Sequence, residues 1–287
     1  MTDWDAWIGR EQRASDRLDE GLASRWLATF DLAEPSPTLL PRYLPQGIHL
    51  ALCTPDAPTA QLGEDGHPTR NDSPDSFLPP VPLPRRMWAA SAIDFISPIP
   101  MGASIVRTSR VVSVTEKSGG SGQLVFVEVE HETSANGTLA VRETQTLVYR
   151  DAAPSDAPLS PPELREVTFD PSEWDAHRAI TPDPLLLFRY SALTFNTHRI
   201  HFDAPYARDI ERYRGLVVHG PLTASLLLQL AANGLGDNTL RSFSFRGVSP
   251  AIANEPLHLV MRGSGENIEL GAFAADGRHV MKASGSV

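Results

Sequence analysis

The sequence is poor in cysteine, in long apolar runs and in basic residues. Its one cysteine, Cys53, cannot form an intramolecular disulfide, which fits a reducing compartment. The longest apolar stretches, at residues 185–188 and 226–228, are far shorter than the ~20 residues that a membrane-spanning helix needs. The acidic N-terminal segment MTDWDAWIGREQRASD lacks the apolar core of a signal peptide. We therefore expect a soluble, cytoplasmic protein with no membrane partner.

Acidic side chains outnumber basic ones. There are 25 Lys and Arg against 35 Asp and Glu, which gives a formal net charge of -10 and a pI near 5.3. A surface of this charge repels phosphate backbones, so we expect no nucleic-acid partner. A small anionic ligand remains compatible if a few cations gather locally. No metal-binding, nicotinamide or flavin motif is present, and we expect no cofactor.

The chain of 287 residues is long enough for two medium domains or one large one. The segment DAAPSDAPLSPPE at residues 151–163 has the Pro- and Ser-rich composition of an interdomain linker. It separates an N-terminal domain, residues 1–150, from a C-terminal domain, residues 164–287. A proline-rich stretch at 54–84 has little periodicity, and a loop of that length is usually disordered or functional.

The first domain shows one helical pattern followed by strand patterns. Large apolar residues recur at helical spacing within 14–31, which predicts an amphipathic helix. From residue 93 to 150 the pattern becomes β-branched and alternating, with Asn136-Gly137 as a strong hairpin signal. An antiparallel sheet is therefore expected there.

The second domain is expected to combine strands with one buried helix. The apolar run at 185–196 predicts a strand, and residues 205–213 predict a short polar helix. Residues 219–234 begin His-Gly-Pro, end Asn-Gly and are apolar on nearly every side, which predicts a buried helix. Strands follow over 240–285, with an Asp-Gly hairpin turn at 276–277. The sequence thus predicts a tandem α+β layout in which each sheet curls around one helix.

Ionisable side chains gather just before this buried helix. Of the nine histidines, three lie close together: His198, His201 and His219. The free N–H groups and positive dipole end at Gly220 can hold a negative oxygen, and a neutral histidine opposite them can move a proton. These groups suit a reaction that passes through an enolate or another oxyanion.

Each of these residues also has a simpler interpretation. His201 could be a hydrogen-bonded structural histidine, and His198 could be exposed to solvent. Arg199 could pair with Asp203, and His219 could simply begin a helix. Zinc binding by His198 and His201 lacks an HxxxH or HExxH spacing, and the single cysteine is distant, so no metal is expected.

Two stretches, RYSALTFNTHRIHFD at 189–203 and GLVVHGPLTASLLLQL at 215–230, resemble the MaoC-like hydratase and dehydratase group of hot-dog folds. More narrowly they resemble the branch that holds fungal mitochondrial 3-hydroxyacyl-thioester dehydratases and bacterial mesaconyl-C4-CoA or itaconyl-CoA hydratases. LGEDGHPTRNDSPDSFLPPVPLPRRMWA at 62–89 resembles the signature loop of those bacterial hydratases. The resemblance covers most of the chain. It implies a double hot-dog protein whose first repeat is degenerate and lacks the long central helix.

The resemblance also implies a catalytic pair. The general motif of R-specific hydratases, Asp-x-Asn-Pro-x-His, places Asn196 at the catalytic Asp position when its last residue is aligned with His201. Because Asn cannot accept a proton from water at neutral pH, we assign proton transfer to His201, with Asn196 orienting the water. His198 is the reserve acid or base. The thioester carbonyl would lie on the N–H of Gly220, beside His219.

A dicarboxylyl substrate needs further cations. Arg85, Arg86 and Arg199 are the candidates because a guanidinium matches the two oxygens of a carboxylate, although they could also be solvated surface charges. The leading hypothesis is a hydro-lyase that converts itaconyl-CoA or mesaconyl-C4-CoA to citramalyl-CoA. The alternatives are a (3R)-3-hydroxyacyl-thioester dehydratase of fatty-acid synthesis and a non-catalytic acyl-CoA-binding hot-dog protein. We expect a CoA thioester as partner, and either a monomer, whose two repeats replace a dimer, or a homodimer.

Overall fold

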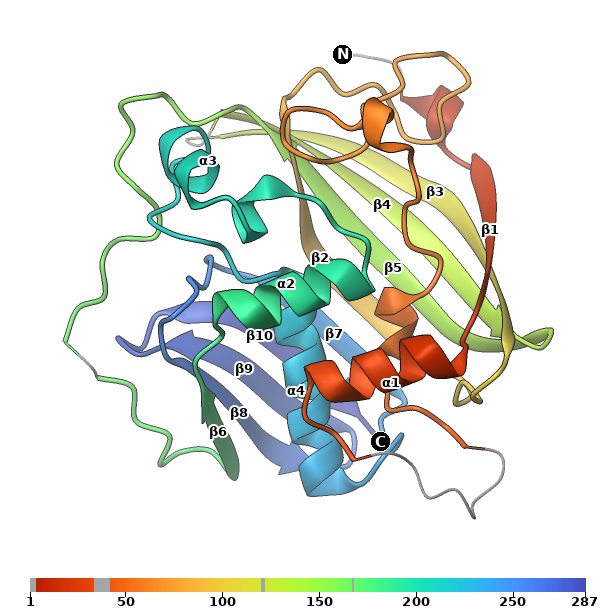
Figure 1. Ribbon diagram of the computed structural model, residues 1–287, viewed down its shortest axis with the longest axis vertical. Coiled ribbons are helices and arrows are strands. Elements are labelled where there is room, and N and C mark those ends of the chain that lie inside the picture. The colour runs from red at the N-terminus through yellow and green to blue at the C-terminus, as the bar shows by residue number, and fades with distance from the viewer. Residues whose placement is uncertain (1–3, 34–41, 120–121, 167) are drawn as a thin grey trace.

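The computed structural model describes residues 4–33, 42–119, 122–166 and 168–287, and these build one antiparallel sheet partly covered by helices (Figure 1). The ten strands of the sheet are β1 (Glu11–Arg17), β2 (Arg85–Phe95), β3 (Ser104–Gly119), β4 (Gly122–Ala135), β5 (Thr138–Arg150), β6 (Ala176–Ile180), β7 (Ser242–Gly247), β8 (Leu257–Ser264), β9 (Asn267–Ala274) and β10 (His279–Ser286). The helices are α1 (Glu20–Thr29), α2 (Pro184–Leu193), α3 (Ala204–Asp209) and α4 (Gly220–Leu235), with short 3-10 turns η1 (Asp5–Trp7), η2 (Ile48–Ala51), η3 (Thr59–Gln61) and η4 (Arg199–His201).

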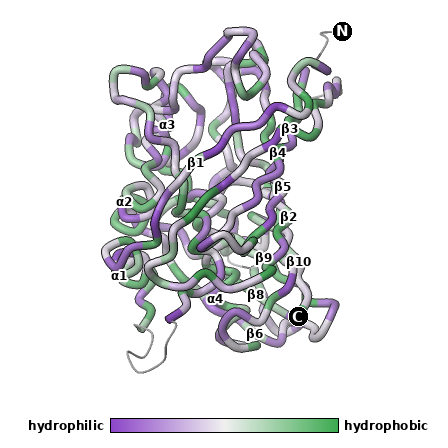
Figure 2. The backbone as a smooth tube through the Cα atoms, turned by 90° about the vertical axis from the view of Figure 1, so that its right-hand side faces the viewer, coloured by the Kyte–Doolittle hydropathy of each residue, from purple (hydrophilic) through white to green (hydrophobic). Residues whose placement is uncertain are grey.

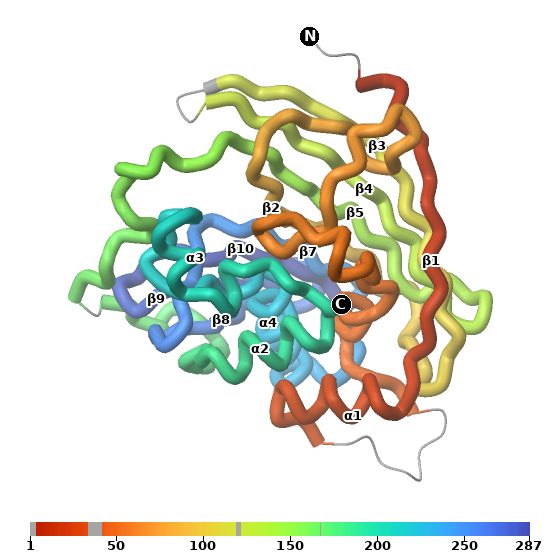
Figure 3. The backbone as a smooth tube through the Cα atoms, turned by 45° about the horizontal axis from the view of Figure 1, so that its top comes forward, coloured from red at the N-terminus to blue at the C-terminus, as the bar shows by residue number. Residues whose placement is uncertain are grey.

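The sheet is made of two halves that meet edge to edge. The strand order is β1-β3-β4-β5-β2-β7-β10-β9-β8-β6, so the first five strands in sequence form one half and the last five the other. The halves join where β2 pairs with β7, from Ala90 opposite Arg246 to Asp94 opposite Ser242. Figure 3 shows this junction between the two curved halves. A side chain near it can therefore reach residues of both halves.

Helix α4 is the central helix of the second half, as its apolar composition predicts. Pro221 lies in its first turn, and Leu222 and Leu227 are fully buried. The helix packs against β6, β8 and β9. It continues one residue beyond the predicted Asn-Gly end, to Leu235, and Gly236 follows with φ 103. Over its described residues the first half has one α-helix, the shorter α1, so the two halves are unequal.

The predicted strand at 185–196 is wrong, because α2 occupies this segment. Asp183 caps the helix by accepting the N–H of Leu186 at 2.8 Å, and Pro184 occupies its first turn. Leu187 is fully buried while Phe188 is 67% exposed, so the apolar run covers more than one side of the helix. Length and composition alone do not distinguish such a short run from a buried strand.

The helix predicted over 14–31 is also shorter than expected. Residues 11–17 form β1, which pairs with β3 at the edge of the sheet. Helix α1 begins only at Glu20, where Asp19 accepts the N–H of Leu22 at 2.7 Å. The Asp19 cap therefore fixes the start of α1 after the end of β1.

The hairpin predictions are confirmed. Asn136 and Gly137 both have positive φ, 51 and 82, and connect β4 to β5 as a two-residue turn. The Asp-Gly pair at 276–277 lies between β9 and β10. The predicted Gly/Ser turn at 118–122 lies between β3 and β4, but residues 120–121 are outside the described part of the chain.

The helices gather over one side of the sheet. In the side view of Figure 2, α1, α2 and α3 lie along one edge of the molecule, opposite strands β2–β5 and β10. The main apolar core runs through both halves and includes Trp26 of α1, Tyr190 of α2 and Leu227 of α4. Among the helices described, none is long and apolar enough to cross a membrane.

Candidate active site

His201 lies in η4, directly before α3, and is buried. Its Nδ1 is 2.7 Å from the carbonyl oxygen of Val217. Because a carbonyl only accepts, Nδ1 carries the proton, and the neutral ring keeps a lone pair on Nε2. No hydrogen bond within the described residues engages Nε2. Burial, with a smaller effect of His198, lowers the pKa of His201 to about 3, so the ring is neutral at pH 7.

His219 stacks on His201 at the start of α4. The two ring centroids are 3.5 Å apart with an interplanar angle of 20°. Ser191 of α2 holds His219 through a 2.9 Å hydrogen bond between its Oγ and Nε2. In the described structure Nδ1 of His219 is buried without a hydrogen-bond partner. Burial lowers the pKa of His219 well below its ordinary value, so the stack consists of two neutral rings.

Gly220 provides the free N–H that the sequence predicts at the beginning of α4. No backbone acceptor in the described chain takes this N–H, as expected for the first turn of a helix. A Cβ placed on Gly220 would meet nothing within 4 Å, so the space beside it is open. An oxygen of a ligand can therefore approach the helix N-terminus next to His219.

His198 connects this stack to a loop of the first half. Its ring centroid is 5.4 Å from that of His201 and 4.1 Å from that of His67. Burial, then the nearby His67, lowers the pKa of His198 to about 3. The expectation that His198 is simply solvent-exposed does not hold.

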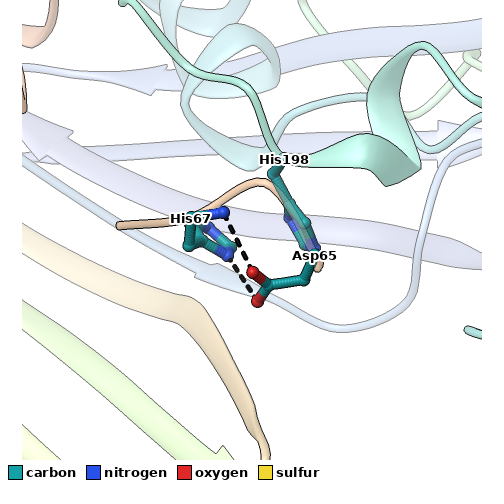
Figure 4. Close-up of side chains that lie close together, drawn as sticks. All are labelled: Asp65, His67 and His198. Atoms are coloured by element: carbon teal, nitrogen blue, oxygen red, sulfur yellow. Dashed lines mark hydrogen bonds and ion pairs between the residues drawn. The ribbon is translucent and has the colours of Figure 1, made fainter. Parts of the chain in front are cut away.

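Asp65 and His67 form a carboxylate–imidazole dyad beside His198 (Figure 4). Nδ1 of His67 is 3.0 Å from Oδ2 of Asp65, and the backbone N–H of His67 donates to Oδ1 at 2.9 Å. Burial alone would raise the pKa of Asp65, but the hydrogen bonds and charge of His67 lower it below its ordinary value. The carboxylate is therefore ionised and fixes the orientation of the His67 ring.

The loop that carries the dyad is fastened to the second half by backbone contacts. The N–H of Arg199 donates to the Asp65 carbonyl at 2.9 Å, and Thr197 Oγ1 donates to the Gly66 carbonyl at 2.5 Å. The Arg199 guanidinium also donates to the Glu64 carbonyl at 3.0 Å. Gly66 has φ +88, and a Cβ there would overlap the carbonyl oxygen of Thr197. Only glycine allows this approach.

A cavity of about 300 Å³ opens beside His198, between the two halves. Its lining is Glu64, Asp65, Pro84, Arg85, Arg86, Met87, Arg150, Ala152, His198, Tyr206, Ile210, Glu211 and Tyr213. A larger hollow of about 710 Å³ lies across β7, β9 and β10, but it contains no histidine. Its charged lining residues are Asp94, Glu173, Asp175, Arg262, Glu266 and Glu269. That excess of carboxylates repels an anionic ligand, so the smaller cavity is the better site.

The three arginines predicted to bind the substrate carboxylate have different surroundings in the structure. Arg199 forms an ion pair with Asp203, at 2.7 and 3.0 Å, which is the simpler interpretation of that residue. Arg85 forms a buried ion pair with Glu211. Arg86 follows Arg85 along β2, stands opposite Tyr149 of β5 and also lines the cavity. Because successive side chains of a strand leave it on opposite faces, the two adjacent arginines do not act as one paired site.

Arg150, which the sequence analysis did not select, shares a face with Arg85. It lies opposite Arg85 in the pairing of β5 with β2 and borders the cavity. Within the described residues it makes no ion pair, and its Nε is buried without a hydrogen-bond partner. Of the three carboxylates that line the cavity, Glu211 and Asp65 are engaged by Arg85 and His67, and Glu64 is exposed to solvent. Arg150 is thus a cavity cation without an ion-pair partner among the described residues.

Asn196 lies close to the histidines, but its side chain already has a backbone partner. Its Oδ1 accepts the N–H of His198 at 2.9 Å, which closes a local turn. The side-chain amide nitrogen keeps its donors for a ligand or water. The water-orienting role predicted for Asn196 stays a prediction.

One group of side chains has donor atoms close enough to be considered for a cation. Asp65, His67 and His198 bring one such atom each within 4.8 Å of one another. The Asp65–His67 hydrogen bond and the packing of the two imidazoles account for this arrangement without an ion.

Four residues of the site were not predicted from the sequence. Asp65 and His67 belong to the 62–89 loop that carries the resemblance, and the run Glu-Asp-Gly-His was the available signal. Ser191 was hidden because its segment was predicted to be a strand. Arg150 ends an alternating strand and has no local signal, because its importance depends on the strand opposite.

Comparison with known proteins identifies the family. A family model described as hydroxyacyl-thioester dehydratase type 2 matches residues 47–253, which is most of the chain. The chain belongs to the hydroxyacyl-thioester dehydratase type 2 family. It is 42% identical over 284 residues to the mesaconyl-C(4)-CoA hydratase of Chloroflexus aurantiacus, covering 98% of this chain and 97% of the relative. It is 26% identical over 264 residues to the mitochondrial hydroxyacyl-thioester dehydratase type 2 of Schizosaccharomyces pombe, covering 81% and 82%.

Solved structures of this fold agree with the architecture. A MaoC-like dehydratase from Phytophthora capsici matches with a TM-score of 0.72 at 12% identity, covering 99% of this chain and 98% of that one. A Mycobacterium tuberculosis protein described as having a double hotdog fold matches with a TM-score of 0.59 at 14% identity, covering 97% and 95%. This member of the hydroxyacyl-thioester dehydratase type 2 family is therefore a MaoC-like α+β double hot-dog enzyme of the hydratase and dehydratase class.

Proposed function

We propose that the protein hydrates an unsaturated C5 dicarboxylyl-CoA thioester, mesaconyl-C4-CoA or itaconyl-CoA, to citramalyl-CoA. The observation that carries the proposal is the neutral His201, whose Nε2 is free beside the open N-terminus of α4. The 42% identity to a mesaconyl-C(4)-CoA hydratase over nearly the whole chain supports this substrate class. The buried, unpaired Cys53 is compatible with a reducing, cytoplasmic location.

In the proposed reaction His201 is the general base. Its Nε2 takes a proton from water as the water oxygen adds to the β carbon of the thioester. Negative charge then develops on the thioester oxygen. This oxygen accepts a hydrogen bond from the N–H of Gly220, at the positive end of α4. Ser191 keeps His219 stacked on His201 and thereby limits the orientations of the base. The side-chain amide of Asn196 is left to orient the water.

The free carboxylate of the substrate would bind in the cavity beside His198. Arg150 is its proposed principal partner because this guanidinium has no acid partner, while Arg85 is shared with Glu211. Arg86 lines the same cavity and is a second proposed cation, whereas the predicted contribution of Arg199 is weaker, since Arg199 is paired with Asp203. A monocarboxylic enoyl thioester would leave Arg150 without this partner.

The test is a comparison of substrates and of two arginine variants. Loss of the absorbance of the conjugated thioester is followed for mesaconyl-C4-CoA and crotonyl-CoA. For itaconyl-CoA, whose double bond is not conjugated with the thioester, formation of citramalyl-CoA is followed by chromatography. Arg150→Met should lower kcat/KM for the dicarboxylyl thioesters roughly 10- to 150-fold, since a hydrogen bond to a charged group contributes about 1.5–3 kcal/mol. Its effect on crotonyl-CoA should stay within threefold. Arg246→Met is the matched control, because Arg246 of β7 is exposed and does not line the cavity, and it should change kcat/KM for each substrate less than threefold.

Each competing function has its own outcome. Equal or better turnover of crotonyl-CoA by the wild type would favour the (3R)-3-hydroxyacyl-thioester dehydratase, the activity named for the Schizosaccharomyces pombe relative. Binding of all three thioesters without turnover would favour a non-catalytic acyl-CoA-binding protein. Either result would contradict the proposed function.

A further inference from the structure

The second half lacks a carboxylate next to its catalytic histidine. Asn196 stands where the related motif has an acid, and its Oδ1 accepts the N–H of His198. Asp203, the nearest acid in sequence, caps α3 by accepting the N–H of Tyr206 at 3.1 Å and is paired with Arg199. Neither side chain supplies a second group for proton transfer beside His201.

A carboxylate from the other half of the molecule approaches the same place. Asp65 borders the cavity that His198 also lines. Its Oδ2 is 3.0 Å from Nδ1 of His67, so the remaining nitrogen of that ring, Nε2, is free of the carboxylate. Figure 4 shows the His67 ring beside His198, and the ring centroids are 4.1 Å apart. The ring of His198 contacts both His67 of the dyad and His201.

The position of the dyad is fixed independently of its own side chains. The carbonyls of Glu64, Asp65 and Gly66 each accept a hydrogen bond from Thr197 or Arg199. These contacts join the loop to the segment that leads into His201. A substitution of the His67 side chain therefore leaves the attachment of the loop intact.

We propose that Asp65 and His67 form a second acid–base dyad of the active site, which replaces the carboxylate missing at position 196. This inference rests on the proposed function, because it assigns His67 a step of the hydration. His67 is the catalytic residue of the dyad, and Asp65 is a positioning residue that orients the ring and stabilises the charge it acquires.

The proton balance of the step is complete. In mesaconyl-C4-CoA, whose double bond is conjugated with the thioester, His201 removes one proton from water, a C–O bond forms at the β carbon, and the π electrons move onto the thioester oxygen to give an enolate. Protonated His67 gives the proton on Nε2 to the α carbon, a C–H bond forms, and the thioester carbonyl is restored. His201 then releases its proton to solvent and His67 takes one up. The net change is the addition of one water.

The experiment compares His67→Gln, Asp65→Asn and Asp72→Asn with the wild type on mesaconyl-C4-CoA, itaconyl-CoA and crotonyl-CoA. His67→Gln should lower kcat about 100-fold or more on the best substrate and change KM less than threefold, because it removes one acid–base group. Added imidazole should restore part of this activity. Asp65→Asn should lower kcat at least about tenfold. Asp72→Asn is the matched control in the same loop, because Asp72 is exposed and does not line the cavity, and it should stay within twofold.

Several results would overturn the inference. A His67→Gln enzyme with kcat within threefold of the wild type would show that the dyad takes no part in proton transfer. A large loss without imidazole rescue, together with a lowered unfolding midpoint, would reduce the dyad to a structural role. Activity that is lost with a chelator and regained with Zn²⁺ would make the cluster a metal site instead.

Failure of the dyad can be told apart from failure of the proposed function. A wild type that prefers crotonyl-CoA refutes only the dicarboxylyl substrate, and the dyad is then tested on crotonyl-CoA. A wild type that hydrates none of the three thioesters overturns both.

Discussion

Acid should destabilise this protein strongly, because three histidines are buried as neutral rings. His49, His201 and His219 are each less than 9% exposed. Burial lowers the pKa of His49 and of His201 to about 3, and that of His219 well below its ordinary value. In the unfolded chain each of them takes up a proton near pH 6.5. Lowering the pH therefore favours the unfolded state.

The sign and size of the effect follow from proton linkage. Above pH 6.5 a histidine with a lowered folded-state pKa is neutral in both states and does not reduce the free energy of unfolding. Below pH 6.5 the unfolded chain binds a proton that the folded protein does not bind, so the free energy of unfolding falls until the pH reaches the folded-state pKa. Between pH 7 and pH 5 each histidine costs about 2 kcal/mol, so the three together cost about 6 kcal/mol. This loss is comparable with the roughly 5–15 kcal/mol that stabilises an ordinary domain.

Urea unfolding followed by tryptophan fluorescence at pH 7, 6, 5.5 and 5 measures this loss. His49→Gln is the informative variant, because His49 lies apart from the stacked pair in the core of the first half. It should flatten the dependence of unfolding free energy on pH by about 1.4 kcal/mol per unit below pH 6, which corresponds to one proton. A wild type that loses less than about 2 kcal/mol between pH 7 and pH 5 would refute the reasoning, since the rings would then be protonated in the folded protein.

Two further substitutions test the construction of the site. Gly66→Ala should detach the 62–67 loop from Thr197, because the new Cβ overlaps a backbone carbonyl at a positive φ. The kcat should then fall about tenfold or more, and limited proteolysis within residues 54–84 should become faster. An alanine variant of normal activity would disprove the close contact. Ser191→Ala should lower the unfolding free energy by about 1–3 kcal/mol in urea titrations, because the buried Nε2 of His219 loses its hydrogen-bond partner. A change below about 0.5 kcal/mol would show that the hydrogen bond contributes nothing.

Local patterns predicted the elements that depend on local chemistry. The buried helix α4 follows from Pro221 and an apolar run, and the β4–β5 hairpin from Asn136 and Gly137. Helix α2 was missed because its apolar run has no clear period, although Asp183 and Pro184 formed a start signal. The edge strand β1 was missed because its side chains are mostly exposed and resemble the first turns of a helix.

The site was predicted only in part, because most of its geometry is non-local. His201 and His219 could be selected from the sequence, but their stacking depends on how η4 and α4 pack. The approach of His67 to His198 joins residues from opposite halves, and no spacing indicates it. That Arg150 joins Arg85 and Arg86 at the cavity depends on the pairing of β2 with β5, which no local pattern indicates.

The central claim is that His201 is the general base of a CoA-thioester hydratase. The most direct measurement is the kcat of His201→Ala on mesaconyl-C4-CoA, with the urea midpoint of the same variant recorded at pH 8, where the wild-type ring is neutral in both states. We predict a fall in kcat of about 100- to 10,000-fold in a folded protein that still binds the thioester. A folded His201→Ala protein with near-normal turnover would contradict the account.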